Sequence, residues 1–231
     1  MSVKFKLEIV KGDAALFHRL HRNPPPSRTV TLCRLENDAM VLGSTQRISP
    51  RYANYAQQHH LELCTRGSGG TGVIAKAGEV IWIDIGLPSY DPLLGDDVSA
   101  SFAPVAAAWI SALGEAGLKG AATHRGAMRK SADFAEVCFA GLAPGEITVA
   151  GRKLVGMSQR RSGHGAYFHT LAYRHFPLEE TMEAFAPSAS LAPGDPEIKV
   201  TDLATVLREG ALLDDVTLAE GIVEALNGLS G

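Results

Sequence analysis

The sequence of 231 residues has few cysteines, few aromatic residues and little net charge. Its three cysteines, Cys33, Cys64 and Cys138, lie far apart and form no C-x-x-C pair. This spacing argues against a disulfide framework or a zinc site, and it indicates a reducing compartment. A formal net charge of −3 gives no reason to expect a nucleic acid or an anionic membrane as a partner.

Long apolar runs are also missing. The first six residues lack the apolar centre of a secretory signal, and no stretch is long enough to span a bilayer. We therefore expect a cytoplasmic protein that has no membrane partner. The hydrophobic content of 45% is enough for one sizeable core and a small appendage.

The hydrophobic pattern predicts a mixture of strands and helices. Predicted strands cover residues 29–35, 40–43, 61–65, 80–85, 134–139, 147–149 and 166–173. Predicted helices cover residues 12–22, 49–60, 97–116, 178–185, 202–208 and 214–226. The first two strands are expected to form a hairpin. Because no strict βαβ order repeats, we predict an α+β fold with a mixed, largely antiparallel sheet flanked by helices.

A composition shift divides the chain near its end. Residues 187–196 are rich in Pro, Ala, Ser and Gly, which is typical of a linker. We therefore predict a main domain over residues 1–190 and a small helical extension over residues 191–231.

Two glycine-containing motifs stand out. Gly67, Gly69 and Gly72 satisfy G-x-G-x-x-G, but a dinucleotide site needs a helix directly afterwards, and here residues 73–76 run into a turn and another strand. No Gly-Lys-Ser/Thr follows, so the loop is not a P-loop either. The second motif is a hairpin with one inward lysine, Lys153, and a glycine, Gly156, that lets a ligand approach closely.

Taken together, these motifs resemble those of the lipoate-protein ligase A and octanoyltransferase family. The first motif matches R-x-S-G-G-x-x-V through Arg66, Ser68, Gly69, Gly70 and Val73. Leu42, Gly43 and Gln46 precede it, and the hairpin matches G-R-K-x-x-G-x-x-Q-R through Gly151, Arg152, Lys153, Gly156, Gln159 and Arg160. The resemblance implies the biotin/lipoate protein ligase fold, which is similar to class II aminoacyl-tRNA synthetases.

The resemblance also implies a reaction, the transfer of an octanoyl or lipoyl group to one lysine of a lipoyl carrier domain. Lys153 would then be a catalytic cation, and the expected substrate-binding residues are Arg66, Ser68, Gly69, Gly70, Gly72, Gly156 and His169. Arg66 is expected at the mouth of the acyl slot. His169 could orient the acyl carbonyl, serve as a base, or be an ordinary strand histidine.

Cys138 decides between mechanisms. In the first reading, Cys138 is a buried core cysteine. In the second, it is a thioester-forming nucleophile whose thiolate Lys153 stabilises, as in the cysteine-dependent octanoyltransferases that this chain resembles most. The second reading needs octanoyl-acyl carrier protein as donor and no cofactor. The alternative is an ATP- and Mg²⁺-dependent ligase that activates lipoate or octanoate as an acyl-AMP. A third reading is a non-catalytic carrier-binding homologue. No resident metal site is expected from the histidine spacing.

Overall fold

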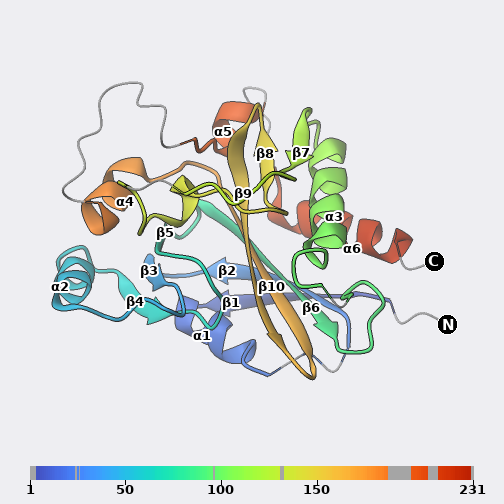
Figure 1. Ribbon diagram of the computed structural model, residues 1–231, viewed down its shortest axis with the longest axis horizontal. Coiled ribbons are helices and arrows are strands. Elements are labelled where there is room, and N and C mark those ends of the chain that lie inside the picture. Colours follow the sequence, from blue (N-terminus) through green and yellow to red (C-terminus); the bar gives the residue numbers. More distant parts are fainter. Residues whose placement is uncertain are drawn as a thin grey trace.

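A seven-stranded sheet forms the centre of the computed structural model, which describes residues 4–23, 25, 27–95, 97–130, 133–186, 199–207 and 213–229 (Figure 1). Its strands, in spatial order, are β1 (Lys6–Gly12), β2 (Thr29–Leu35), β6 (Val80–Pro88), β10 (Gly165–Tyr173), β9 (Arg152–Ser162), β8 (Ile147–Val149) and β7 (Ala121–Thr123). Only β1 and β2 are parallel neighbours among these described strands. The predicted mixed, largely antiparallel α+β fold is therefore confirmed.

A second, three-stranded sheet lies beside the first. Its order is β4 (Glu62–Thr65), β3 (Ala39–Leu42) and β5 (Val73–Ala75). The predicted hairpin between β2 and β3 is wrong, because β2 already pairs with β1 on one side and with β6 on the other. With both edges of β2 occupied, the chain after it turns away and β3 pairs with β4 and β5.

The helix starts follow their capping residues. Asp13 accepts a hydrogen bond from the backbone of Leu16 at the start of α1 (Ala14–Leu20). Ser49 caps α2 (Pro50–Gln58), whose first residue is proline, as predicted. The remaining helices are α3 (Phe102–Glu115), α4 (Leu178–Phe185), α5 (Leu203–Val206) and α6 (Asp215–Gly228). None of the helices within the described ranges is long and apolar enough to cross a membrane.

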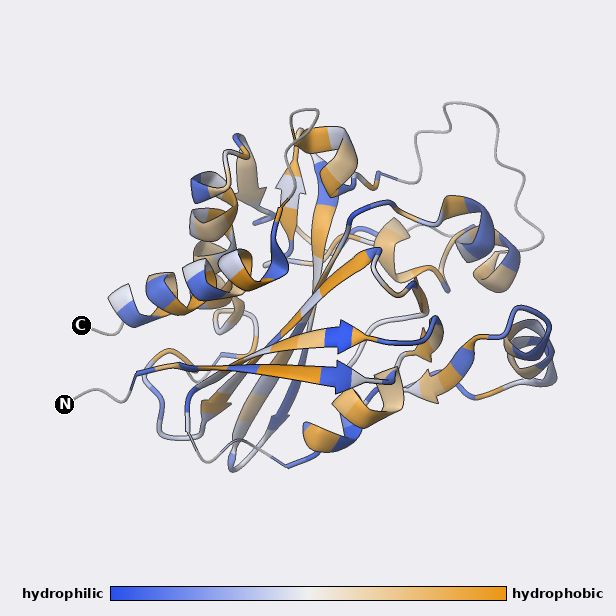
Figure 2. Cartoon of the chain, turned by 180° about the vertical axis from the view of Figure 1, so that it is seen from behind, coloured by the Kyte–Doolittle hydropathy of each residue, from blue (hydrophilic) through white to orange (hydrophobic). Residues whose placement is uncertain are grey.

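The main core lies between the large sheet and the pair α3 and α6, which pack against each other (Figure 1). Figure 2 shows hydrophobic and hydrophilic residues alternating along α6, as expected for a helix with one buried face. Trp109 of α3 is fully buried, and its indole N–H donates to Thr170 Oγ1 of β10 over 2.9 Å. This bond fixes the helix on the strand that also carries His169.

The C-terminal segment joins the same core. The predicted linker at residues 187–196, and with it the expected boundary at residue 190, lies outside the described residues. Beyond it, the backbone N–H of Lys153 donates to Lys199 O over 2.7 Å, and Thr201 N–H donates to Lys153 O over 2.9 Å. Leu218 and Ile222 of α6 are buried in the main core. The segment after residue 198 therefore supports the strand that carries Lys153.

The predicted strand at residues 134–139 is wrong. Cys138–Ala140 instead forms one turn of 3₁₀-helix, and Val137 makes only an isolated bridge with Gly72. The carbonyl oxygens of Cys138 and Gly141 both accept from the ammonium of Lys153. Two carbonyls three residues apart reach one nitrogen only where the backbone turns, which an extended strand does not allow.

The glycine-rich loop depends on a close approach to Gly43, which follows β3. A Cβ at Gly43 would lie 1.8 Å from the carbonyl oxygen of Gly70, far inside van der Waals contact. Gly70 itself has a φ of +98°, a conformation that L side chains rarely adopt. The loop can lie in this position only with glycine at both places.

We predict that Gly43→Ala lowers the free energy of unfolding by about 2 kcal/mol or more, because backbone must move to admit the new methyl group. Gly114→Ala is the matched control. Gly114 lies in α3, and a Cβ at this position would have no neighbouring atom within 4 Å, so this change should stabilise the protein by about 0.5–1 kcal/mol. Urea unfolding of both variants checks the pair, and equal effects would contradict the close-approach argument.

Candidate functional site

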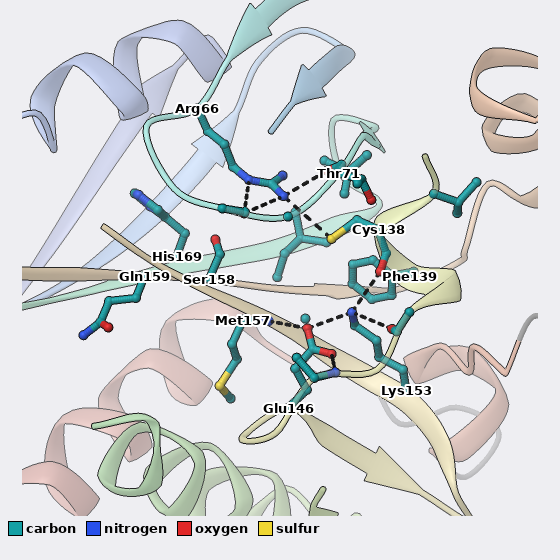
Figure 3. A pocket seen from close by; sticks show the side chains of 18 of the residues that line it. Arg66, Thr71, Cys138, Phe139, Glu146, Lys153, Met157, Ser158, Gln159 and His169 are labelled. Atoms are coloured by element: carbon teal, nitrogen blue, oxygen red, sulfur yellow. Dashed lines mark hydrogen bonds and ion pairs between the residues drawn. The ribbon is translucent and has the colours of Figure 1, made fainter. Parts of the chain in front are cut away.

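A cavity of about 810 Å³ lies where the glycine-rich loop, the Cys138 turn and strands β9 and β10 face one another (Figure 3). Most of the predicted site residues line it, namely Arg66, Gly69, Gly70, Cys138, Lys153, Gly156 and His169. Apolar side chains complete much of its wall, among them Val41, Val73, Trp82, Phe139 and Leu171. A cavity of this kind suits an apolar chain that carries one reactive polar end.

Ser68 and Gly72 do not line the cavity but hold the glycine-rich loop from behind. The Ser68 hydroxyl shares a hydrogen bond of 2.9 Å with the hydroxyl of Ser158 on β9. Gly72 N–H donates to Glu136 O over 2.9 Å, and Cys138 N–H donates to Gly72 O over 3.0 Å. The two residues that were expected to bind substrate therefore join the loop to β9 and to the Cys138 turn.

Lys153 is the most constrained side chain of the site. Only 2% of its surface is exposed, and its ammonium forms an ion pair of 2.7 Å with Glu146 Oε1. It also donates to the carbonyl oxygens of Cys138 and Gly141, each over 3.1 Å, and lies 4.6 Å from the ring centre of Phe139. An ammonium has three hydrogens, and three protein oxygens accept them.

Glu146 is a site residue that the sequence reasoning missed. Its buried carboxylate accepts from Ala143 N–H over 2.7 Å and from Met157 N–H over 3.2 Å, in addition to the contact with Lys153. The signal was present, because an inward lysine in a strand needs a buried counter-ion. Glu146 directly precedes the partner strand β8 and was the nearest acidic residue in the hairpin.

Arg66, not Lys153, is the cation beside the cysteine sulfur. Arg66 Nη2 lies 3.7 Å from Cys138 Sγ, whereas the ammonium of Lys153 contacts the carbonyl oxygen of the same cysteine (Figure 3). The expectation that Lys153 acts on the thiol is therefore corrected by this geometry. The expected place of Arg66 at the mouth of the slot is also wrong. Its side chain is 6% exposed, and its guanidinium donates to Gly69 O and Thr71 O.

A buried carboxylate organises the opposite side of the cavity. Asp84 on β6 accepts from Trp82 Nε1 over 2.8 Å, from His21 Nδ1 over 2.7 Å and from His169 Nδ1 over 2.9 Å. Burial alone would raise the pKa of Asp84, but His169 and His21 hold it well below its usual range. The ligand atoms of His21, Asp84 and His169 lie within 4.8 Å of one another, as a metal site requires. The hydrogen bonds from His21 and His169 to Asp84 already explain why these atoms lie together, so their proximity is no argument for a metal.

His18 of α1 is the second residue that the sequence reasoning missed. It is 9% exposed and lines the cavity, with its ring 5.2 Å from that of His169 and 5.1 Å from that of Trp82. Neither ring nitrogen has a hydrogen-bond partner among the described residues. Burial, together with the charge of His169, lowers the pKa of His18 to about 3. In the sequence it resembles any polar residue of a short amphipathic helix, so no pattern identifies it.

We predict that Lys153→Met lowers the free energy of unfolding by about 3–5 kcal/mol, because the carboxylate of Glu146 would stay buried without its cation. The double variant Lys153→Met/Glu146→Gln should recover part of this loss. Lys119→Met, at an exposed position, should change the free energy by less than about 0.5 kcal/mol. Urea unfolding of the three variants provides the measurement. A single variant as stable as the double would show that the ion pair carries no such constraint.

The burial of His18 predicts a loss of stability in mild acid. Below its ordinary pKa of 6.5 the unfolded chain binds a proton at His18 that the folded chain does not bind until about pH 3. Stability therefore falls with pH through this window, by up to ~1.4 kcal/mol for each pH unit.

Unfolding by urea at pH 7.5 and pH 5.0 tests this prediction. The wild type should lose about 1–2 kcal/mol more than His18→Phe between these two conditions, because the variant has no group to protonate at this position. The comparison cancels the effect of all other titrating groups that the two proteins share. The same pH dependence in both proteins would contradict the prediction.

The comparisons with known proteins identify the family and the fold of this chain. The sequence model of the lipoyl protein ligase A/B catalytic domain matches residues 11–225. No curated protein matches the chain in sequence. Among solved structures, a T. acidophilum protein with bound lipoic acid has a TM-score of 0.68 at 12% identity, covering 99% of this chain and 86% of that one.

Two further structures show the same fold. A lipoate-protein ligase A bound with ATP has a TM-score of 0.63 at 16% identity, covering 98% of this chain and 86% of that one. A bi-partite lipoate protein ligase of Thermoplasma acidophilum, described with its E2 lipoyl domain, has a TM-score of 0.66 at 10% identity, covering 98% and 83%. The family match extends over nearly the whole chain, and the chain therefore belongs to the lipoyl protein ligase A/B catalytic domain family and is an enzyme of this kind.

Proposed function

We propose that this enzyme transfers an octanoyl or lipoyl group to a lysine of a lipoyl carrier domain through a thioester on Cys138. The observation that carries the proposal is the position of Cys138, whose sulfur faces the cavity with Arg66 Nη2 3.7 Å away. A guanidinium at this distance can donate a hydrogen bond to the sulfur atom that attacks the acyl carbonyl and later leaves it. A lipoyl domain as acceptor is supported by the similar archaeal ligase that was described with its E2 lipoyl domain.

The other two cysteines lack these properties. Cys33 and Cys64 are buried outside the cavity lining, and burial raises the pKa of both thiols, that of Cys64 to about 12. Cys138 is half-buried and reachable from the cavity. Of the three thiols, only Cys138 combines access with a neighbouring cation.

The proposed reaction has two balanced steps. The thiolate of Cys138 attacks the thioester carbonyl of octanoyl-acyl carrier protein, a new thioester forms, and the carrier thiol leaves and takes up a proton. The uncharged amine of the lipoyl-domain lysine then attacks the Cys138 thioester, an amide forms, and the Cys138 sulfur leaves as thiolate. The proton that the amine loses in this step passes to solvent and balances the proton that the carrier thiolate took up in the first step.

Lys153 supports both steps through position and charge. Its contact with Cys138 O fixes the turn that presents the sulfur. To stabilise an oxyanion directly, the ammonium must exchange one of its two carbonyl contacts for the reacting oxygen, while its contact with Glu146 is retained.

The alternative is an ATP-dependent ligase that forms a lipoyl-AMP intermediate, as suggested by the similar ligase with bound ATP. The exposed Arg129 and Lys130 at the cavity would suit a phosphate chain. The fit to Mg²⁺ is poor, however, because Glu146 is the only acidic residue in the described lining and its oxygens are engaged by Lys153 and two backbone N–H groups. This favours the transferase.

We predict that the wild-type chain gains one octanoyl mass when it is mixed with octanoyl-acyl carrier protein without ATP, and that neutral hydroxylamine removes it. The group should pass to a lipoyl domain, but not to a domain in which arginine replaces the target lysine. Cys138→Ser should reduce turnover to below about 10⁻³ of the wild-type rate, because the nucleophile is lost. Intact-mass measurements follow each step.

Cys64→Ala is the matched control, and it should retain turnover because its sulfur lies away from the cavity. Labelling that needs ATP and survives Cys138→Ser would overturn the thioester mechanism in favour of the ligase. Binding of the lipoyl domain with no transfer under either condition would overturn the proposed acyl transfer.

A further inference from the structure

Two cations in the cavity lining have no role in the proposed chemistry. Arg129 and Lys130 are exposed, and their charged ends make no hydrogen bond or ion pair with another residue of the described ranges. Lys153, by contrast, is paired with Glu146, which is the only acidic residue in the described lining. The lining therefore carries excess positive charge, and an anionic group that enters the cavity is attracted to Arg129 and Lys130.

The backbone holds this basic pair beside the turn that carries the thiol. Arg129 N–H donates to Leu142 O over 2.8 Å, and Leu142 N–H donates to Arg129 O over 3.0 Å. Leu142 directly follows Gly141. The carbonyl oxygens of Gly141 and Cys138 both accept from the ammonium of Lys153. The pair is therefore held at the reactive end of the cavity.

The cavity has more room than an acyl chain fills. Pockets of about 300–1,000 Å³ are typical of drug-sized ligands, and this cavity, at about 810 Å³, lies in the upper part of that range. An unbranched octanoyl group is smaller than such a ligand. A thioester also has two arms, because the acyl chain and the thiol carrier extend from opposite sides of the reacting carbonyl carbon. With the acyl chain on the apolar wall, the space at the reactive end is left for the thiol arm of the donor.

The chemistry of that arm matches the lining around Arg129. The thiol of an acyl carrier protein ends a pantetheine arm, which has amide groups, a branched apolar segment and, at its far end, a phosphate. Met128 precedes the basic pair and Phe134 follows it in the sequence, and both line the same cavity. Apolar side chains suit the branched segment, while a guanidinium and an ammonium suit the phosphate.

We propose that Arg129 and Lys130 bind the phosphate of the donor's pantetheine arm and thereby select the acyl donor. The inference rests on the proposed function, because it requires a thioester donor that acylates Cys138. A phosphorylated donor makes charge contacts that the same donor without phosphate lacks. These contacts lie away from the reacting carbonyl and hold the donor before and during the reaction alike. They therefore lower KM and leave kcat unchanged.

A matched pair of small donors tests the site. Octanoyl-pantetheine and octanoyl-phosphopantetheine differ only in the phosphate. Without ATP, and with both donors below saturation, the wild type should form the Cys138 thioester about tenfold faster from the phosphorylated donor, because two exposed charge contacts are gained. Intact-mass measurements over time give both rates.

Variants assign the preference to the basic pair. Arg129→Gln/Lys130→Gln should lose the preference and react with octanoyl-pantetheine within about twofold of the wild-type rate. Lys119→Gln/Arg125→Gln is the matched control, because it removes the same charge at two exposed positions outside the described lining. The control should keep the wild-type preference.

Three further reactions tell the possible sources of the phosphate apart. Octanoyl-carrier protein and octanoyl-coenzyme A both carry the pantetheine arm, and the faster donor with the wild type should react about tenfold more slowly with Arg129→Gln/Lys130→Gln. An unchanged rate would overturn the proposal. The third reaction is labelling with octanoate and ATP. If the double variant slows only this reaction, the pair serves a nucleotide and the proposal is wrong.

The outcomes separate this inference from the proposed function. A wild type that reacts equally fast with the two small donors overturns the phosphate site and leaves the thioester mechanism intact. A control variant that loses the preference as completely as Arg129→Gln/Lys130→Gln reveals a general charge effect and also overturns the site. A wild type that no thioester donor acylates overturns both. The comparison of the two small donors in the wild type needs no variant, so a variant that does not fold leaves the test decisive.

Discussion

The buried ion pair between Lys153 and Glu146 is the interaction on which the site depends. A lone ammonium or a lone carboxylate in this place would be strongly unfavourable, so each is retained only with the other. The ammonium and the carboxylate of this pair make their other hydrogen bonds to backbone groups. Lys153 turns the chain at Cys138 and Gly141, and Glu146 accepts from Ala143 and Met157. One pair thereby sets the relative positions of the Cys138 turn, the start of β8 and the middle of β9.

The glycine-rich loop is attached to this centre by a different kind of constraint, the absence of side chains. Gly43 admits the carbonyl of Gly70, and Gly72 admits the ring of Phe185, which a Cβ would meet at 2.1 Å. The loop can then lie against the Cys138 turn, where Gly72 exchanges backbone hydrogen bonds with it. Arg66 fills the concave side of the loop, and the same Nη2 that donates to Thr71 O lies 3.7 Å from Cys138 Sγ. The cation beside the sulfur is thus a consequence of loop closure.

Local chemistry made much of the fold predictable. Ser49-Pro50 marked the start of α2, and the β-branched residues around Gly151 marked the β8–β9 hairpin. The failures have a common cause, since partners distant in the sequence outweighed local propensity. The segment 134–139 has strand-like residues but turns because Lys153 holds two carbonyls at its end and just beyond it. Residues 39–42 do form a strand, yet they pair with β4 and β5 because both edges of β2 are occupied.

The candidate site, like the fold, was predictable in part. Motif spacing located Arg66, Cys138 and Lys153, but it could not assign which cation meets the sulfur, since that depends on side chains crossing between elements. At the histidine end the resemblance indicated only His169, because His18 lies on a short helix and Asp84 on another strand, which the fold alone brings together with it.

The two ends of the cavity therefore differ in what they can do. At one end, charges are concentrated, since Arg66, Lys153 and Glu146 surround the turn that carries the thiol. At the other end, the buried carboxylate of Asp84 accepts hydrogen bonds from Trp82, His21 and His169, so its hydrogen bonds are made within this group. His18 packs its ring against Trp82 and His169 at this end of the wall, with both of its ring nitrogens buried. Charge beside the thiol at one end, and a polar group whose hydrogen bonds are satisfied within the wall at the other, leave the space between them to apolar contacts.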